Sequence, residues 1–136
     1  MTVNKNRDTV FTGSHDGCIT SWDVATGESN RIGGVGHGNQ MNGMVTLGES
    51  IFTCGIDNAI KEVNIMTKSF TNTNIKLASQ PRGLAGNGTT LIVPCEKEVG
   101  SKNRSHFRYF PEDGTKVDAC FSNKVGKLSL NFTFNN

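Results

Sequence analysis

The sequence contains no apolar run close to the roughly 20 residues that a membrane-spanning helix needs, so no transmembrane helix is expected. The first twenty residues are polar and charged, and they contain no apolar segment of the kind that a secretory signal peptide carries. We therefore predict a soluble cytoplasmic protein that does not bind membranes.

Helical periodicity is also lacking, because no convincing stretch of it extends beyond two turns. Leu and Ala are infrequent, whereas Asn is common and the chain has 16 Gly. This composition is typical of many short strands joined by tight turns. With 136 residues the chain has the length of one domain, and we predict an all-β fold.

The chain has little net charge, +2 at pH 7, which gives no electrostatic reason to expect nucleic acid or an anionic membrane as a partner. The basic and aromatic stretch at 102–110 is soon followed by acidic residues, so we interpret it as a solvated surface of mixed charge. No C-x-x-C pair is present, and we expect free thiols rather than disulfides or a zinc site. The four cysteines are Cys18, Cys54, Cys95 and Cys120.

What the sequence does have is a repeat. Residues 11–24 match residues 52–65 without a gap, forty-one positions further along the chain. The first copy predicts two strands joined by a turn at His15–Gly17, where Asp can hydrogen-bond its own backbone and Gly accepts positive φ. This copy also contains the dipeptide Trp22–Asp23. A period of about 40–45 residues with a Trp-Asp dipeptide is typical of WD-repeat β-propeller blades.

The repeat divides the chain into four units. We predict a partial blade at 1–32, a complete four-stranded blade at 33–75, and a partial third blade at 76–99 with a turn at Gly86–Gly88. Residues 100–136 lose the blade pattern and are predicted to be a divergent tail with one strand near its end. The expected fold is therefore a set of four-stranded antiparallel WD-repeat blades, in an incomplete open arc of about two to three blades.

The polar residues of the repeat have a structural use. A His before the inner strand, a Ser or Thr in the second strand, the turn Asp and a Trp in the third strand can form one hydrogen-bonded chain. Such a chain gives each buried polar group a partner and avoids a desolvation penalty. In the second unit Val63 replaces the Trp, and in the first unit the His position would precede Met1. The candidate structural residues are His37, Thr53 and Asp57 in the second unit, and Thr12 or Ser14, Asp16 and Trp22 in the first.

No catalytic, metal or cofactor site is predicted. His15, His37 and Asp16 cannot be assembled into a Ser-His-Asp set, and no spacing typical of metal ligands occurs. The glycine-rich stretch Gly33–Gly38 fails the G-x-G-x-x-G pattern because position 39 is Asn, so a dinucleotide is not expected there. We predict that the protein is not an enzyme.

Several stretches together are similar to the actin-interacting protein 1 family of WD-repeat proteins. The resemblance extends from the start of the chain to about residue 99, and it implies that the chain corresponds to the start of the second of two seven-bladed propellers. The stretches that carry it are Thr12–Gly17, Trp22–Asp23, Thr26–Glu28, Gly36–Gln40 and Lys76–Pro81.

The resemblance implies a non-catalytic scaffold on the actin cytoskeleton. Members of this family bind actin filaments together with ADF/cofilin and promote filament disassembly, so actin filaments and ADF/cofilin are the expected partners. The resemblance assigns no partner contact to a numbered residue of this chain. The alternative is a general WD-repeat interaction scaffold in another complex, such as a ubiquitin-ligase adaptor.

Overall fold

The described residues of the computed structural model fold into three antiparallel β-sheets. The description covers residues 1–88, 90–95, 103–110, 114–122 and 130–135, with side chains placed in the first two of these ranges. No helix occurs among the described residues.

The first sheet contains four strands from the N-terminal part of the chain. In spatial order they are β1 (Thr2–Val3), β2 (Thr9–Gly13), β3 (Ile19–Asp23) and β4 (Ser29–Arg31). Polar turns join these strands. In the turn between β1 and β2, the side chain of Asn4 accepts hydrogen bonds from the backbone N–H groups of Asp8 and Thr9, both 3.1 Å long. In the two connections between β1 and β3, Arg7 and Gly17 adopt positive φ angles of 60° and 78°.

The second sheet also contains four strands. They are β5 (Met41–Leu47), β6 (Ser50–Gly55), β7 (Ala59–Asn64) and β8 (Ser69–Lys76). Asn58, with a φ of 56°, takes the turn position that Gly17 takes in the first sheet. The register of the β5–β6 ladder shifts between Met41 and Gly43. This irregularity brings Met41 and Met44 to the same side of the sheet, and both pack toward the first sheet.

The third sheet contains five strands, ordered β13-β12-β11-β10-β9. They are β9 (Ala85–Asn87), β10 (Thr90–Pro94), β11 (Asn103–Phe110), β12 (Thr115–Ser122) and β13 (Leu130–Asn135). The ladder between β10 and β11 crosses the boundary that the sequence placed after residue 99. The segment 100–136, which shows no blade pattern, thus supplies three strands to the same sheet as β9 and β10.

The turn predicted at Gly86–Gly88 was placed wrongly. Gly86 and Asn87 belong to β9, where they pair with Leu91 and Thr90. The ladder therefore continues to Asn87, and the connection is as short as a two-residue hairpin loop. Gly88, with a φ of 57°, adopts the left-handed conformation that such a loop requires.

Two apolar cores lie between successive sheets, and strands β6 and β7 of the second sheet contribute residues to both, since side chains of a strand alternate between its two faces. One core joins the first and second sheets and contains Phe11, Ile19, Ile32, Ile51 and Val63. The other joins the second and third sheets and contains Phe52, Cys54, Ile60, Ile75, Leu91 and Val93. Neighbouring residues of β6 therefore point into different cores.

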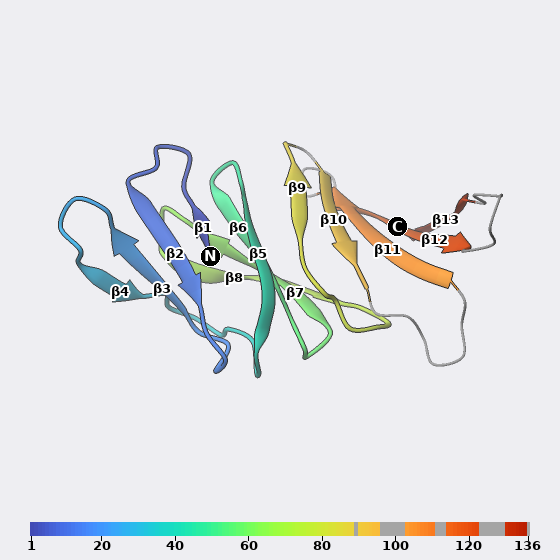
Figure 1. Ribbon diagram of the computed structural model, residues 1–136, viewed down its shortest axis with the longest axis horizontal. Coiled ribbons are helices and arrows are strands. Elements are labelled where there is room, and N and C mark those ends of the chain that lie inside the picture. The colour runs from blue at the N-terminus through green and yellow to red at the C-terminus, as the bar shows by residue number, and fades with distance from the viewer. Residues whose placement is uncertain (89, 96–102, 111–113, 123–129, 136) are drawn as a thin grey trace.

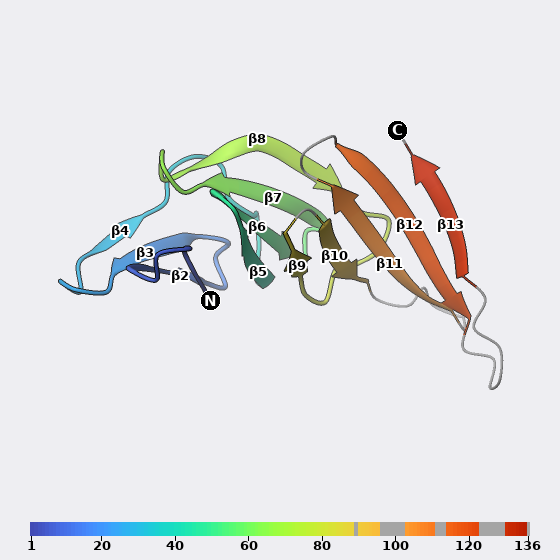
Figure 2. The same cartoon turned by 90° about the horizontal axis from the view of Figure 1, so that it is seen from above.

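The three sheets follow one another along the chain in the manner of propeller blades (Figure 1). The inner strands β1, β5 and β9 are neighbours, and the hydroxyls of Thr2 and Thr46 are joined by a 2.9 Å hydrogen bond between β1 and β5. Figure 2 shows β5 and β9 on one side of the molecule and the outer strand β8 on the other. The described sheets form an arc that does not close into a ring. The predicted fold class, an incomplete arc of antiparallel WD-repeat blades, is confirmed.

Within the described part of the chain, no helix is long and apolar enough to cross a membrane.

The burial of two valines predicts a large difference in how much their replacement by Ala lowers the free energy of unfolding. Val63 is 0% exposed and Val24 is 58% exposed. Val63→Ala removes two buried carbons and leaves a cavity, so it should lower the free energy of unfolding by about 2–3 kcal/mol. Val24→Ala is the matched control and should change it by less than about 0.5 kcal/mol. Urea unfolding of both variants measures the difference, and equal losses would contradict this description of the core.

Candidate functional site

The most connected polar site lies where the chain passes from the first sheet to the second, in residues 33–40, which we call the crossing loop. His37 is 5% exposed and Thr53 is 0% exposed. The Nε2 atom of His37 lies 2.8 Å from the Thr53 hydroxyl, and its Nδ1 lies 3.0 Å from both carboxylate oxygens of Asp57. The backbone N–H of Gly38 also donates to Asp57, at 3.3 Å. The site thus ties the crossing loop to β6 and to the β6–β7 turn.

The hydrogen bonds assign the protonation state of His37. Burial lowers the pKa of His37 below its ordinary value, although the hydrogen bond with Asp57 opposes this shift. In the neutral ring, Nδ1–H donates to Asp57 and Nε2 accepts the Thr53 proton. Burial would raise the pKa of Asp57, but the hydrogen bond from His37 and the backbone N–H groups outweigh it and hold that pKa below its usual range. At neutral pH the contact is therefore a hydrogen bond from a neutral imidazole to a carboxylate.

Two glycines allow the backbone to come this close. A Cβ on Gly17 would overlap the His37 carbonyl, and the φ of +78° at this position already disfavours other residues. A Cβ on Gly55 would lie 2.9 Å from Nδ1 of His37 and 3.0 Å from Oδ1 of Asp57. A side chain at either Gly17 or Gly55 would therefore prevent His37 from fitting between the sheets.

Sequence reasoning missed Lys61, which also holds the crossing loop. Its Nζ donates to the backbone carbonyls of Val35 and Gly36, at 3.1 and 2.8 Å. Gly33 adds two backbone bonds to the start of β8, with Lys68 and Phe70. The repeat gives no indication of the Lys61 contact, because the equivalent residue of the first unit is Thr20.

In the first sheet the candidate residues form two separate pairs. The indole N–H of Trp22 donates to the Thr12 hydroxyl at 2.8 Å, which decides between Thr12 and Ser14 as its partner. Ser14 instead donates to Asp16, whose carboxylate also accepts the backbone N–H of Cys18 at 3.1 Å. These hydrogen bonds, that from Ser14 first, hold the pKa of Asp16 below its usual range. Trp22 remains 41% exposed, because it lies on the face of the first sheet that points away from the second.

The connectivity Thr53–His37–Asp57 is that of a nucleophile, a base and an orienting carboxylate. Catalysis by such a set needs a nucleophile that a substrate can reach. The Thr53 hydroxyl is completely buried between two sheets, and its proton is directed to Nε2 of His37 or, at 3.4 Å, to the carbonyl of Lys61. The arrangement is suited to satisfying buried polar groups rather than to acyl transfer.

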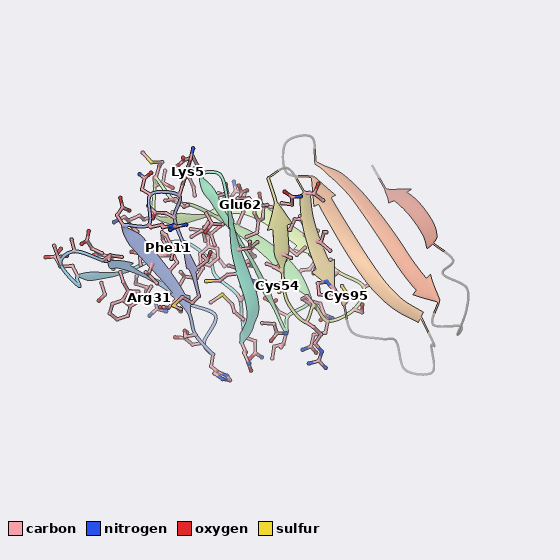
Figure 3. The ribbon with its side chains drawn as sticks, turned by 45° about the horizontal axis from the view of Figure 1, so that its top comes forward. Lys5, Phe11, Arg31, Cys54, Glu62 and Cys95 are labelled. Atoms are coloured by element: carbon pink, nitrogen blue, oxygen red, sulfur yellow. The ribbon has the colours of Figure 1, made fainter. Side chains whose placement is uncertain are left out.

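A second polar cluster surrounds Glu62 of β7, which is labelled in Figure 3. One carboxylate oxygen accepts the Ser50 hydroxyl at 2.6 Å, and the other accepts the hydroxyls of Thr71 and Thr73 at 3.2 and 2.7 Å. These bonds link β6, β7 and β8 across the outer part of the second sheet. No feature of the repeat predicts the cluster, since Ser21 is the equivalent of Glu62.

A small hollow of about 100 Å³ lies at the inner seam of the first two sheets. None of the seven candidate residues lines it. The residues that do are Met1, Gly13, Met41, Asn42, Gly43 and Met44. Across the residues whose side chains are described, no group of three His, Cys, Asp or Glu is placed to hold a metal ion.

Among the described cysteine side chains, Cys18 and Cys54 are free thiols, and the Sγ of Cys95 donates to the backbone carbonyl of Val93 at 3.6 Å. Cys54 belongs to the core between the second and third sheets, where burial raises the pKa of its thiol to about 12. A buried, protonated thiol behaves as a small apolar side chain. The side chain of Cys120 lies outside the described residues.

Substitutions of the equivalent threonines Thr53 and Thr12 compare the stability contribution of a buried hydrogen bond with that of a more exposed one. Thr53→Val keeps the side-chain shape but leaves Nε2 of buried His37 without its hydroxyl partner, which should cost about 1–3 kcal/mol of unfolding free energy. Thr12→Val, at the matched position of the first sheet, leaves only the half-exposed Trp22 indole unpaired and should cost less. Urea unfolding compares them, and an equal or smaller loss for Thr53→Val would contradict the proposed hydrogen-bonded chain.

The His37 pKa also predicts a pH dependence. Because burial holds this pKa below the ordinary 6.5, the unfolded chain binds more protons than the folded chain as the pH falls through 6.5. The contribution of neutral His37 is therefore complete above that value and is lost progressively below it. The contribution of Asp57 has a separate window, since it is lost only below its ordinary value of 3.8.

We expect the free energy of unfolding to decrease between pH 7.5 and pH 5.5, and His37→Gln to flatten this decrease. His15 is exposed, so His15→Gln is the control and should leave the slope as it is. Urea titrations at several pH values provide the measurement. A slope that persists in His37→Gln would assign the effect to another group.

The comparisons with known sequences cover about 70% of the chain. No family model matches it. The sequence is 41% identical over 99 residues to Actin-interacting protein 1 of Drosophila melanogaster, covering 71% of this chain and 16% of that protein. It is 39% identical over 104 residues to WD repeat-containing protein 1-B of Xenopus laevis, covering 73% of this chain and 17% of that protein. Actin-interacting protein 1 of Caenorhabditis elegans is 33% identical over 100 residues.

Solved structures share the backbone arrangement at much lower sequence identity. U3-55K has a TM-score of 0.71 and 10% identity, and the match covers 98% of this chain and 48% of U3-55K. The computationally designed Ika8 protein has a TM-score of 0.63 and 13% identity, with 93% of this chain and 46% of that protein covered. These likenesses show the fold alone.

The sequence relatives identify the family to which the chain belongs. This chain spans only 16% to 17% of the length of the relatives from Drosophila and Xenopus. The Xenopus relative is named a WD repeat-containing protein, and the three sheets of this chain pack on one another through two shared cores, as successive blades do. The chain thus belongs, as a partial chain, to the actin-interacting protein 1 family of WD-repeat proteins.

Proposed function

We propose that the chain is part of a non-catalytic actin-binding scaffold of the actin cytoskeleton, which acts with ADF/cofilin in filament disassembly. The observation that carries this proposal is the 41% identity to a protein named for its interaction with actin. The chain spans a small share of that protein, so the partners and the activity of the whole are proposed for this segment rather than transferred to it. We further propose that it corresponds to the start of a second propeller.

The geometry of the polar site supports a scaffold rather than an enzyme. We propose that the seven candidate residues serve the architecture of the blades, because the hydrogen-bonded set in the second sheet is buried and joins the crossing loop to two strands. The partners would then bind the exposed surface of the arc. The residues involved are Thr12, Ser14, Asp16 and Trp22 in the first sheet, and His37, Thr53 and Asp57 in the second.

Co-sedimentation tests the actin proposal directly. We expect the folded 136-residue chain, checked first by circular dichroism, to pellet with actin filaments. Because the proposal couples binding to cofilin, the apparent affinity should rise at least about fivefold on cofilin-decorated filaments, the lower end of typical coupling between two ligands. Pelleted fractions over a range of filament concentrations give both affinities.

Microtubules provide the control for non-specific pelleting. Equal pelleting with microtubules, or none with either kind of actin filament, would contradict actin binding by this chain. Binding that is the same with and without cofilin would retain actin and remove the cofilin part of the proposal. A chain that fails to bind actin filaments but keeps its fold would favour a general WD-repeat scaffold in another complex.

A further inference from the structure

Strand β13 forms an edge of the third sheet. It pairs with β12 in an unbroken one-to-one register, from Leu130 opposite Phe121 to Asn135 opposite Lys116. Among the described strands β12 is its only partner, so no described strand pairs with the backbone N–H and C=O groups of the other edge of β13. An exposed strand edge is a template for pairing with a further strand.

The outer strands of the other two sheets carry features that block such pairing. β4 has only three residues and ends with the charged Arg31. β8 is longer, but its ladder with β7 is irregular between Lys61 and Val63, and Lys76 places a charge at its end. Short length, charge and irregular pairing are the usual protections of an edge strand.

β13 has none of these protections. Its six residues, Leu-Asn-Phe-Thr-Phe-Asn, contain no charged residue, no proline and no glycine. Apolar and polar residues alternate along it, and aromatic residues and threonine favour strands. A segment of this composition is well suited to pairing with a copy of itself.

We propose that β13 pairs antiparallel with β13 of a second copy of this chain, which joins two third sheets into one continuous sheet. A second copy fits this edge because an uncharged strand does not repel itself. Antiparallel pairing around the strand centre is also related by a twofold axis, so it closes after two copies and leaves neither copy of β13 at an edge. The inference rests on the third sheet alone and is independent of the actin proposal.

The test uses the whole 136-residue chain. Sedimentation velocity over a range of concentrations should show a monomer–dimer equilibrium. Thr133→Lys adds a charge near the proposed twofold axis, where the two lysines would lie close together, and should raise the dimer dissociation constant by about tenfold or more. Asn72→Lys adds the same charge at an exposed position of β8 and should leave the dissociation constant unchanged.

Hydrogen exchange keeps the proposal testable if Thr133→Lys disturbs the fold. In the unmodified chain, the backbone amides of 130–135 should exchange more slowly as dimer accumulates, whereas those of β8 should not change. A chain that stays monomeric, a dimer whose 130–135 amides are not further protected, or equal weakening by Asn72→Lys would overturn the proposal. Open-ended assemblies in place of a dimer would also overturn it, since twofold pairing closes.

Discussion

The burial of apolar faces between successive sheets is the interaction on which the rest of the structure depends. Strand β6 shows this most directly, because Ile51 points into the core shared with the first sheet and Phe52 into the core shared with the third. Each sheet alone would expose both faces to water. The arc is therefore stabilised by contacts between neighbouring sheets, as in other repeat proteins. Polar groups that lie between these sheets must find hydrogen-bond partners there.

The crossing loop shows how polar groups are accommodated between two packed sheets. The loop must pass between two sheets without leaving buried backbone and side-chain groups unpaired. His37 meets this requirement with Thr53 on one side and Asp57 on the other, while Lys61 caps two carbonyls of the same loop. The result is a junction in which these polar groups of the crossing loop have hydrogen-bond partners.

The sequence predicted the strands that lie within the forty-one-residue repeat. The two strands expected on either side of the His15–Gly17 turn are observed as Thr9–Gly13 and Ile19–Asp23, because alternating residues and turn residues specify them locally. It did not predict β11 and β12, whose pairing continues the ladder from β10 and is decided by tertiary contacts rather than by local pattern. Lys61 was missed for a similar reason, since its partners in the crossing loop lie 26 and 25 positions away.

The first sheet keeps the threonine–tryptophan part of the expected hydrogen-bonded chain, and the second sheet keeps the threonine–histidine–aspartate part. In both sheets a threonine hydroxyl of the second strand can also donate to the equivalent carbonyl of the third strand, from Thr12 to Thr20 at 3.5 Å and from Thr53 to Lys61 at 3.4 Å. A hydroxyl both donates and accepts, so it can be satisfied with the Trp22 indole alone or with His37 alone. Replacing the indole by the apolar Val63 removes a donor without leaving an unpaired one, and such a change costs little. This explains how neighbouring blades retain different parts of the set while each threonine hydroxyl keeps a hydrogen-bond partner.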